Sequence, residues 1–246
     1  MSAVAAVLSA ILGRVLAPSP SPGTLDDVVA GLVVAAAVAW HPMWRRLRHG
    51  ITIVHEAGHG FAATVTRRRL AGIRLHSDTS GLTVSVGQAR GAGMALTLAA
   101  GYPAPCGAGV LVAWAVGAGH AALALWGALL LLTLVLVQIR NWFGLWTVLL
   151  SGVLVAAATW WLDPIWRMRI ALALAALLLL GGLRAAIELG GARRRDRRGT
   201  SDADQLARIT ALPGGVWAAL FVLAGLVALA AGVLLLAPPG LLPHPA

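Results

Sequence analysis

The chain of 246 residues contains no lysine, a single cysteine and only nine acidic residues. Charged side chains make up 11% of it, whereas a soluble domain carries roughly a quarter. So few charges cannot cover the surface of a soluble protein of this size, and Cys106 has no partner for a disulfide. The composition therefore excludes an ordinary soluble domain and any internal disulfide.

Long apolar runs take the place of the missing charge, and 59% of the residues are hydrophobic. A membrane-spanning helix needs about 20 apolar residues. Runs near this length lie at about 27–44, 92–117, 119–138, 144–162, 168–190 and 214–237. We predict an all-α polytopic membrane protein with about six or seven apolar helices, embedded in a cell membrane such as the bacterial plasma membrane.

We expect a single membrane-embedded domain over residues 1–246, with no separate soluble part. Residues 1–24 form an N-terminal anchor-like segment: an apolar stretch with one arginine, then a Ser-Pro-rich loop. Residues 238–246 are rich in proline, and we expect a flexible tail there.

All 19 basic residues are arginine, and the formal net charge is +10. The arginines gather beside apolar runs, at 45–48, 67–69 and 193–198, where positive-inside topology signals lie. This placement indicates a lipid bilayer as the partner, and not a nucleic acid. It also predicts that the polar loop 191–212 is cytoplasmic and that the C-terminus lies outside.

Two shorter segments do not fit a simple crossing. Residues 51–66 are apolar except at their centre, are short for a span, and have arginines on both sides, so we expect a partly inserted or deeply packed helix. Residues 73–87 alternate apolar and polar side chains around a turn at 77–81, which predicts a small β-hairpin. Such a hairpin cannot face lipid, because its edges would lack hydrogen-bond partners.

The sequence His55-Glu56-Ala57-Gly58-His59 lies inside the apolar segment 51–66 and fits the pattern HExxH. On a helix, residues four apart share a face, so both imidazoles can bind one Zn²⁺ ion. Glu56 can then act as the general base on a water molecule at the metal. Ionisable groups in an apolar helix are costly and usually functional, although they could also simply bond one another within a bundle.

Several further segments accompany this motif, and together they resemble the site-2 protease-like family of membrane metallopeptidases, in its bacterial M50B-like branch. They are Ile73-Arg74-Leu75-His76-Ser77-Asp78-Thr79-Ser80-Gly81, Ala100-Gly101-Tyr102-Pro103-Ala104-Pro105, Arg140-Asn141-Trp142-Phe143-Gly144, Ser201-Asp202-Ala203-Asp204-Gln205-Leu206-Ala207 and Leu212-Pro213-Gly214-Gly215-Val216-Trp217. The resemblance implies a zinc endopeptidase that cleaves a membrane-anchored protein within or near the bilayer. The alternatives are a non-catalytic membrane scaffold that keeps the fold and, with less support, a transporter.

The third zinc ligand is where the chain departs from that family, because the usual later Leu-Asp-Gly or Asn-Pro-Asp-Gly motif is absent. Catalytic zinc normally has three protein ligands, so another group must complete the site. The candidates are Asp202, Asp204 and Asn141. Ser201 and Asp204 read as a helix cap, which leaves Asp202 freer to reach inward, and we predict Asp202 as the ligand.

The remaining polar candidates have other expected roles. We assign Asn141 and Tyr102 to substrate binding, with a hydrogen bond between the two as an alternative for Asn141. His76 and Glu188 remain minor candidates for the metal. The hairpin could hold an unwound substrate by strand addition.

Overall fold

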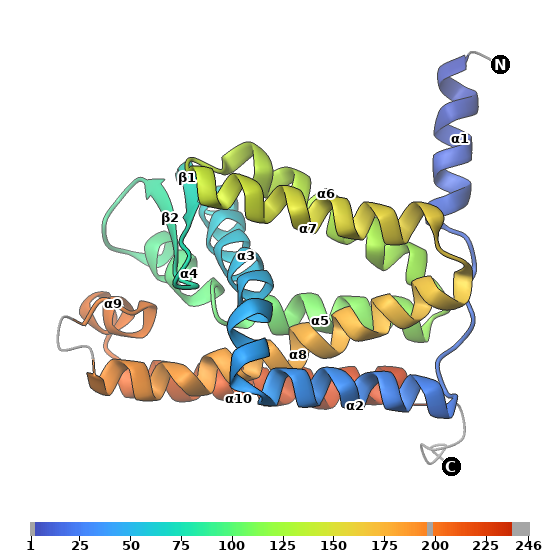
Figure 1. The fold of residues 1–246 in the computed structure, drawn as a ribbon. Coiled ribbons are helices and arrows are strands. Elements are labelled where there is room, and N and C mark those ends of the chain that lie inside the picture. The colour runs from blue at the N-terminus through green and yellow to red at the C-terminus, as the bar shows by residue number, and fades with distance from the viewer. Residues whose placement is uncertain (1–2, 196–198, 238–246) are drawn as a thin grey trace, which may run out of the picture.

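Helices dominate the computed structural model, which describes residues 3–195 and 199–237 (Figure 1). The predicted tail, residues 238–246, lies outside the described residues. The elements in chain order are α1 (Ala3–Val15), α2 (Leu25–Ala39), α3 (His41–Val65), β1 (Arg69–Leu75), β2 (Gly81–Val86), α4 (Ala92–Ala100), α5 (Pro103–Gly117), α6 (Ala121–Gln138), α7 (Trp142–Trp161), α8 (Pro164–Arg195), α9 (Asp202–Ile209) and α10 (Gly214–Leu236).

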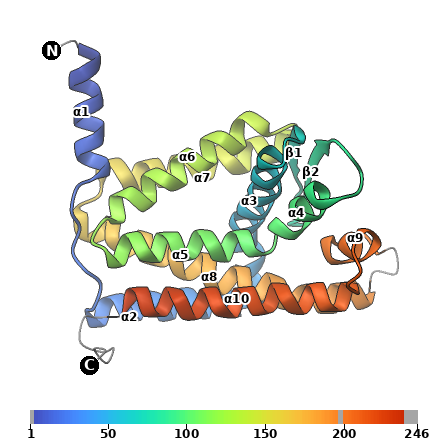
Figure 2. The ribbon, with the colours of Figure 1, turned by 180° about the vertical axis from the view of Figure 1, so that it is seen from behind.

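The long helices are apolar on all sides, as expected of helices that face lipid. Among the described residues, α6, α7, α8 and α10 are each long and apolar enough to cross a membrane. Two bent pairs, α2 with α3 and α4 with α5, raise the number of candidate spans to 6. Figures 1 and 2 show two groups of these helices: α6 runs beside α7, and α2, α5, α8 and α10 run together on the other side of the bundle. The predicted helical multi-pass architecture is confirmed.

Small residues let the central helices approach closely, as is common between membrane helices. α8 contacts α2, α5 and α10. A Cβ at Gly182 of α8 would lie 2.6 Å from the sulfur of Cys106, and one at Gly109 of α5 would lie 2.8 Å from Leu179. Cys106 is thus a buried packing residue between α5 and α8.

The predicted single helix over residues 27–44 is wrong. α2 ends at Ala39, and α3 starts at His41 with a bend of 100° between them. Pro42 lies in the first turn of α3, where its missing N–H costs nothing, whereas inside a continuous helix it would remove a hydrogen bond. The HExxH segment therefore belongs to a 25-residue helix that lies across the ends of the bundle.

The predicted hairpin is confirmed, although its first strand begins earlier, at Arg69. β1 and β2 pair antiparallel, with Ile73 opposite Thr83 and Leu75 opposite Gly81. The outer edge of β1 is also occupied, because Ile73 forms a parallel bridge with Ile139 and its carbonyl accepts a hydrogen bond of 2.9 Å from the N–H of Arg140. Within the described residues, β2 is the strand that keeps a free edge.

Much of the polar stretch 191–212 is helical in the part of it that the structure describes. α8 continues to Arg195, and α9 follows with Ser201 as its N-cap. Ala203 and Leu206 of α9 are fully buried and pack in a cluster with Leu98 of α4 and Phe221 of α10. This amphipathic short helix is thereby fixed against the bundle at the end where the hairpin and α4 also lie (Figure 1).

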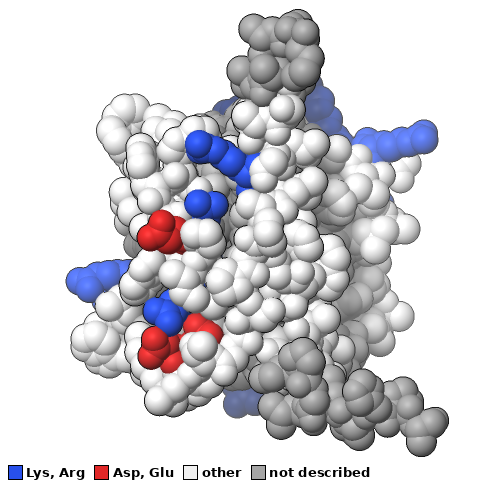
Figure 3. Space-filling view, turned by 90° about the vertical axis from the view of Figure 1, so that its right-hand side faces the viewer, with Lys and Arg blue, Asp and Glu red and all other residues white. Residues whose placement is uncertain are grey.

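The two ends of the bundle differ in charge. The arginine clusters at 45–48, 67–69 and 193–195 belong to the end that carries α3, the hairpin and α9. The opposite end, seen in Figure 3, shows only scattered charges on its described surface. α1 emerges at that opposite end and points away from the bundle (Figure 1).

Candidate metal centre

Three side chains from two distant parts of the chain meet beside α3. The Nε2 atoms of His55 and His59 lie 3.0 Å apart. The Oδ2 atom of Asp202 lies 3.2 Å from the first and 3.3 Å from the second. Within the described part of the chain, these three form the group of potential ligand atoms close enough to hold one metal ion.

The orientation of His59 is set by the backbone of α4. Its Nδ1 lies 2.6 Å from the carbonyl oxygen of Thr97. Because a carbonyl only accepts hydrogen bonds, Nδ1 carries a proton, which leaves Nε2 as the ring atom that faces His55 and Asp202 and that a metal ion could bind. A backbone carbonyl in this position is the usual partner of a metal-binding histidine.

The break between α4 and α5 brings backbone against the two imidazoles. Gly101 lies at this break, where the two helices bend by 62°. A Cβ at Gly101 would overlap the ring of His59 and lie 2.7 Å from Cε1 of His55. A Cβ at Gly58 would likewise overlap Ala104 of α5. Glycine at both positions allows α3 to lie directly against the break.

Asp202 reaches the site as the first residue of α9. The Ser201 hydroxyl accepts a hydrogen bond from the N–H of Asp204 and donates one of 2.6 Å to its carboxylate. Arg193 binds the same carboxylate at 2.7 Å. Asp204 is therefore occupied at the helix start, while Asp202 turns inward.

The environment of Asp202 favours its charged form. Burial raises the pKa of this carboxyl group, but hydrogen bonds and charge from His55 and His59 outweigh it and hold the pKa below 3.8. A carboxylate that stays ionised is suited to binding a cation.

Glu56 lies under the hairpin, with only 3% of its surface exposed. The hydroxyl of Thr83 donates a hydrogen bond of 2.6 Å to Oε2 of Glu56. A Cβ at Gly81 would overlap the carboxylate of Glu56, so this strand passes directly over it. β2 thus fixes one carboxylate oxygen of Glu56 beside the three-residue cluster.

A cavity of about 490 Å³ opens above these groups. His55, Glu56, His59 and Asp202 all line it, and so do Gly81, Leu82, Thr83 and Ser85 of β2. No residue of β1 does. The cavity is large enough for a short extended polypeptide, and β2 is the strand that such a polypeptide would meet.

The comparison with protein families matches residues 28–232 to the family described as Peptidase M50B-like. This match covers most of the chain and all of the residues of the site. The chain belongs to the Peptidase M50B-like family. No curated protein and no solved structure matches the chain significantly. It is therefore a multi-pass membrane protein of a peptidase family.

The donor set of this M50B-like protein fits zinc. Two imidazole nitrogens and a carboxylate oxygen are ligands that Zn²⁺ accepts in catalytic sites. Tetrahedral ligands at bond lengths of 2.0–2.1 Å lie about 3.3 Å from one another. The three donor atoms lie 3.0, 3.2 and 3.3 Å apart, close to this value.

Of the two residues assigned to substrate binding, Tyr102 lines the cavity of the M50B-like site and Asn141 does not. Tyr102 packs edge-on against His55, with ring centroids 4.8 Å apart, and stacks on Phe221. Asn141 does not contact Tyr102. Its Nδ2 donates a hydrogen bond of 2.7 Å to the carbonyl of Leu75, and its Oδ1 accepts one of 3.1 Å from the same residue's N–H.

The minor metal candidates stay apart from the cluster. His76 is exposed in the hairpin turn, where its ring lies 3.2 Å from the hydroxyl of Ser80. Glu188 pairs instead with Arg48 at 3.1 Å and with Arg184 at 2.8 Å.

Three residues that contribute to this site were missed in the sequence. Thr97 orients His59, Thr83 holds Glu56, and Gly101 makes room for the imidazoles. Gly101 had a detectable signal, since it stands in a glycine- and proline-rich stretch that predicts a kink. Thr83 and Thr97 had none, because each acts through contacts between elements far apart in the chain.

Proposed function

We propose that this protein is a zinc-dependent endopeptidase that cleaves a membrane-anchored protein within or close to the bilayer. The observation that carries the proposal is the convergence of His55, His59 and Asp202 beside the buried Glu56 in one cavity. Two imidazoles, one carboxylate and a separate general base are the parts that metal-assisted peptide hydrolysis requires.

The chemistry divides between the ion and the chain. A zinc ion held by His55, His59 and Asp202 would polarise the peptide carbonyl and lower the pKa of water to about 7. Glu56 accepts a proton from the water molecule as the water oxygen bonds to the carbonyl carbon. It then returns this proton to the amide nitrogen as the C–N bond breaks. The hydrogen bond from Thr83 keeps its carboxylate aimed at the cavity.

The free edge of β2 is suited to holding the substrate. The peptide bonds of a transmembrane helix are hydrogen-bonded within that helix, so the segment must unwind before hydrolysis. An extended chain that adds to β2 recovers those hydrogen bonds through the strand. β1 cannot serve this role, because Ile139 and Arg140 already occupy its outer edge. Asn141 secures this arrangement by its two bonds to Leu75.

Cleavage takes place at the arginine-rich end of the bundle, where α3, the hairpin and α9 meet. Under the positive-inside rule this end faces the cytoplasm. The resemblance to the bacterial M50B-like branch favours the plasma membrane of a bacterial cell. A substrate helix would enter from the lipid and unwind at this interface.

Glu56→Gln separates an enzyme from a non-catalytic scaffold. Glutamine has nearly the same shape but cannot take a proton, so we expect zinc content to be unchanged and cleavage to fall by at least about 100-fold. The measurement combines elemental analysis with cleavage of labelled single-span membrane proteins in nanodiscs. A zinc chelator should abolish the wild-type rate, and zinc should restore it. Cleavage by the variant at the wild-type rate would falsify the general-base assignment.

A further inference from the structure

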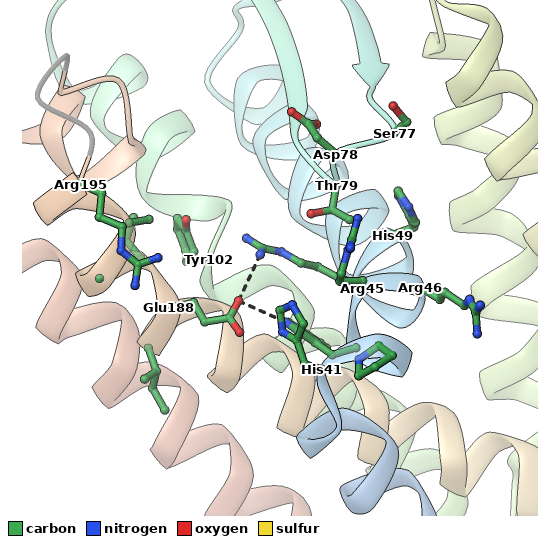
Figure 4. Close-up of a pocket in the computed structure, with 17 residues that line it drawn as sticks. His41, Arg45, Arg46, His49, Ser77, Asp78, Thr79, Tyr102, Glu188 and Arg195 are labelled. Atoms are coloured by element: carbon green, nitrogen blue, oxygen red, sulfur yellow. Dashed lines mark hydrogen bonds and ion pairs between the residues drawn. The ribbon is translucent and has the colours of Figure 1, made fainter.

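A second cavity of about 930 Å³ lies beside the catalytic one (Figure 4). Its walls come from the first half of α3, the hairpin turn and the end of α8. Four arginines line it: Arg45, Arg46 and Arg48 from α3, and Arg195 from α8. We call this cavity the arginine vestibule.

One of its two carboxylates is fully engaged by neighbours. Glu188 binds Arg48 at 3.1 Å and the indole N–H of Trp44 at 3.2 Å (Figure 4). Its other oxygen binds Arg184 at 2.8 Å. Glu188 is therefore paired with Arg48 and Arg184, and it forms no ion pair with the other arginines of the vestibule.

The second carboxylate is held in the hairpin turn. Asp78 accepts hydrogen bonds from the backbone N–H and the hydroxyl of Ser80, at 3.0 and 2.7 Å. Arg45, Arg46 and Arg195 are exposed, and no ion pair joins them to any residue within 3–195 and 199–237. The described lining of the vestibule is thus positive on balance, with four arginines against the carboxylates of Glu188 and Asp78.

The arginine vestibule and the catalytic cavity share a wall. Arg48, Thr79 and Tyr102 line both. The turn that precedes β2 leads from the catalytic cavity into the vestibule. A polypeptide lying along β2 past Glu56 therefore passes Thr79 and enters the vestibule.

We propose that the arginine vestibule binds an acidic segment of the substrate, a few residues beyond the cleaved bond. This inference rests on the proposed peptidase function and names its substrate class: membrane proteins with aspartate or glutamate beside the cleaved segment. Guanidinium groups bind carboxylates through paired, charge-assisted hydrogen bonds. Complementary charge raises both specificity and the rate of association. Continuity with the catalytic cavity favours a polypeptide over a lipid phosphate as the anion.

Binding can be measured without catalysis on the full-length Glu56→Gln protein in phosphatidylcholine nanodiscs. The probes are fluorescein-labelled peptides with a valine- and threonine-rich half followed by four glutamates or by four glutamines. We expect the acidic peptide to bind about tenfold more tightly at low salt, and the difference to shrink as salt screens the charges. Fluorescence anisotropy gives both dissociation constants.

Two triple variants remove equal charge from different places. Arg45→Gln/Arg46→Gln/Arg195→Gln should abolish the preference for the acidic peptide. Arg67→Gln/Arg69→Gln/Arg90→Gln should keep it, because these exposed arginines line neither cavity. Equal binding of the two peptides, or equal loss in both triple variants, overturns the proposal.

Two further measurements complete the test: the lipid that stays bound to the protein, and the cleavage of the two peptides. If the vestibule variant loses bound phosphatidylglycerol in native mass spectrometry but keeps the acidic preference, the vestibule is a lipid site and the proposal is wrong. If the wild type cleaves acidic and neutral peptides equally well, the peptidase function is supported, and the proposal that the vestibule selects acidic substrates is wrong. If it cleaves neither while the binding preference persists, the peptidase proposal fails and acidic binding remains.

Discussion

Asp202 and Asp204 stand two positions apart at the start of α9 and have different partners. Asp202 faces His55 and His59, whereas Asp204 binds Ser201 and Arg193. Side chains two positions apart on a helix point to different faces, so only one of the two enters the cavity. The direction in which α9 starts thus decides which of the two carboxylates faces the imidazoles.

Alanine substitutions test this division. Asp202→Ala should lower zinc affinity by more than the roughly 10–100-fold that loss of an outer-shell partner costs. Asp204→Ala should retain zinc but lower the Tm, because it removes the carboxylate that binds Ser201 and Arg193, and such a hydrogen bond contributes about 1 kcal/mol. Titration with a competing chelator and thermal unfolding measure the two effects. Zinc retained by the first variant and lost by the second would exchange their roles.

The capping contribution of Asp204 should also depend on pH in a defined direction. Burial raises the pKa of Asp204, but hydrogen bonds from Arg193 and Ser201 hold it below 3.8. A carboxyl group with a lowered pKa stabilises the fold fully above its ordinary pKa and loses this effect as the pH falls further. The Tm difference between wild type and Asp204→Ala is therefore complete at neutral pH and shrinks only below about pH 4.

At the scale of elements, the break between α4 and α5 allows α3, the helix of the proposed zinc site, to pack closely against it. The bend brings Gly101 against the imidazoles, and the last turn of α4 supplies the carbonyl of Thr97. On the other side of the site, Thr83 of the hairpin holds the Glu56 carboxylate by a hydrogen bond. Each side chain of the site is held by an element from a different part of the chain.

Gly101→Ala should disrupt the site through contact alone. Gly101 has an ordinary helical conformation, so an added methyl group strains no backbone angle but overlaps His59. We expect zinc affinity to fall at least about tenfold. Gly107→Ala is the matched control, since a Cβ there meets nothing within 4 Å. Isothermal titration with zinc distinguishes the two, and equal affinities would contradict the contact described here.

At the scale of the whole molecule, charge asymmetry gives the bundle an orientation. Arginine clusters lie on both sides of the HExxH segment, which conflicts with a single crossing under the positive-inside rule. The conflict disappears because α3 lies across one end of the bundle, and both clusters stay at that end (Figure 1). The same end carries the last turn of α8 with Arg193, Arg194 and Arg195.

Cysteine labelling tests this orientation in intact cells. In a Cys106→Ala background, Arg90→Cys should resist a membrane-impermeant maleimide until the cells are opened. Asp163→Cys should react from outside, because it precedes α8 at the opposite end. Both positions are exposed, so their reactivity depends on the side of the membrane. The reverse labelling pattern would invert the topology.

The sequence alone identified the membrane class, the hairpin and the HExxH residues. Apolar length, alternation and helical spacing are local properties, and a local pattern predicts what lies within one element. The same reasoning wrongly predicted one helix over residues 27–44, because hydropathy does not detect the 100° bend that Pro42 permits. It also described residues 191–212 as a polar loop, although it recognised the helix cap at Ser201 and Asp204. Burial of Leu206 against other helices stabilises the helix α9 that starts there.

Only the tertiary structure decided which carboxylate faces the imidazoles and what holds Glu56 in place. Asp202 is separated from His55 by well over a hundred residues, and its approach depends on α9 packing against α4 and α10. Thr83 contacts Glu56, and Gly101 lies against the two imidazoles. The spacing of these residues in the sequence does not predict either contact. Metal geometry requires donors to be placed within tenths of an ångström, and such placement results from the packing of many elements together.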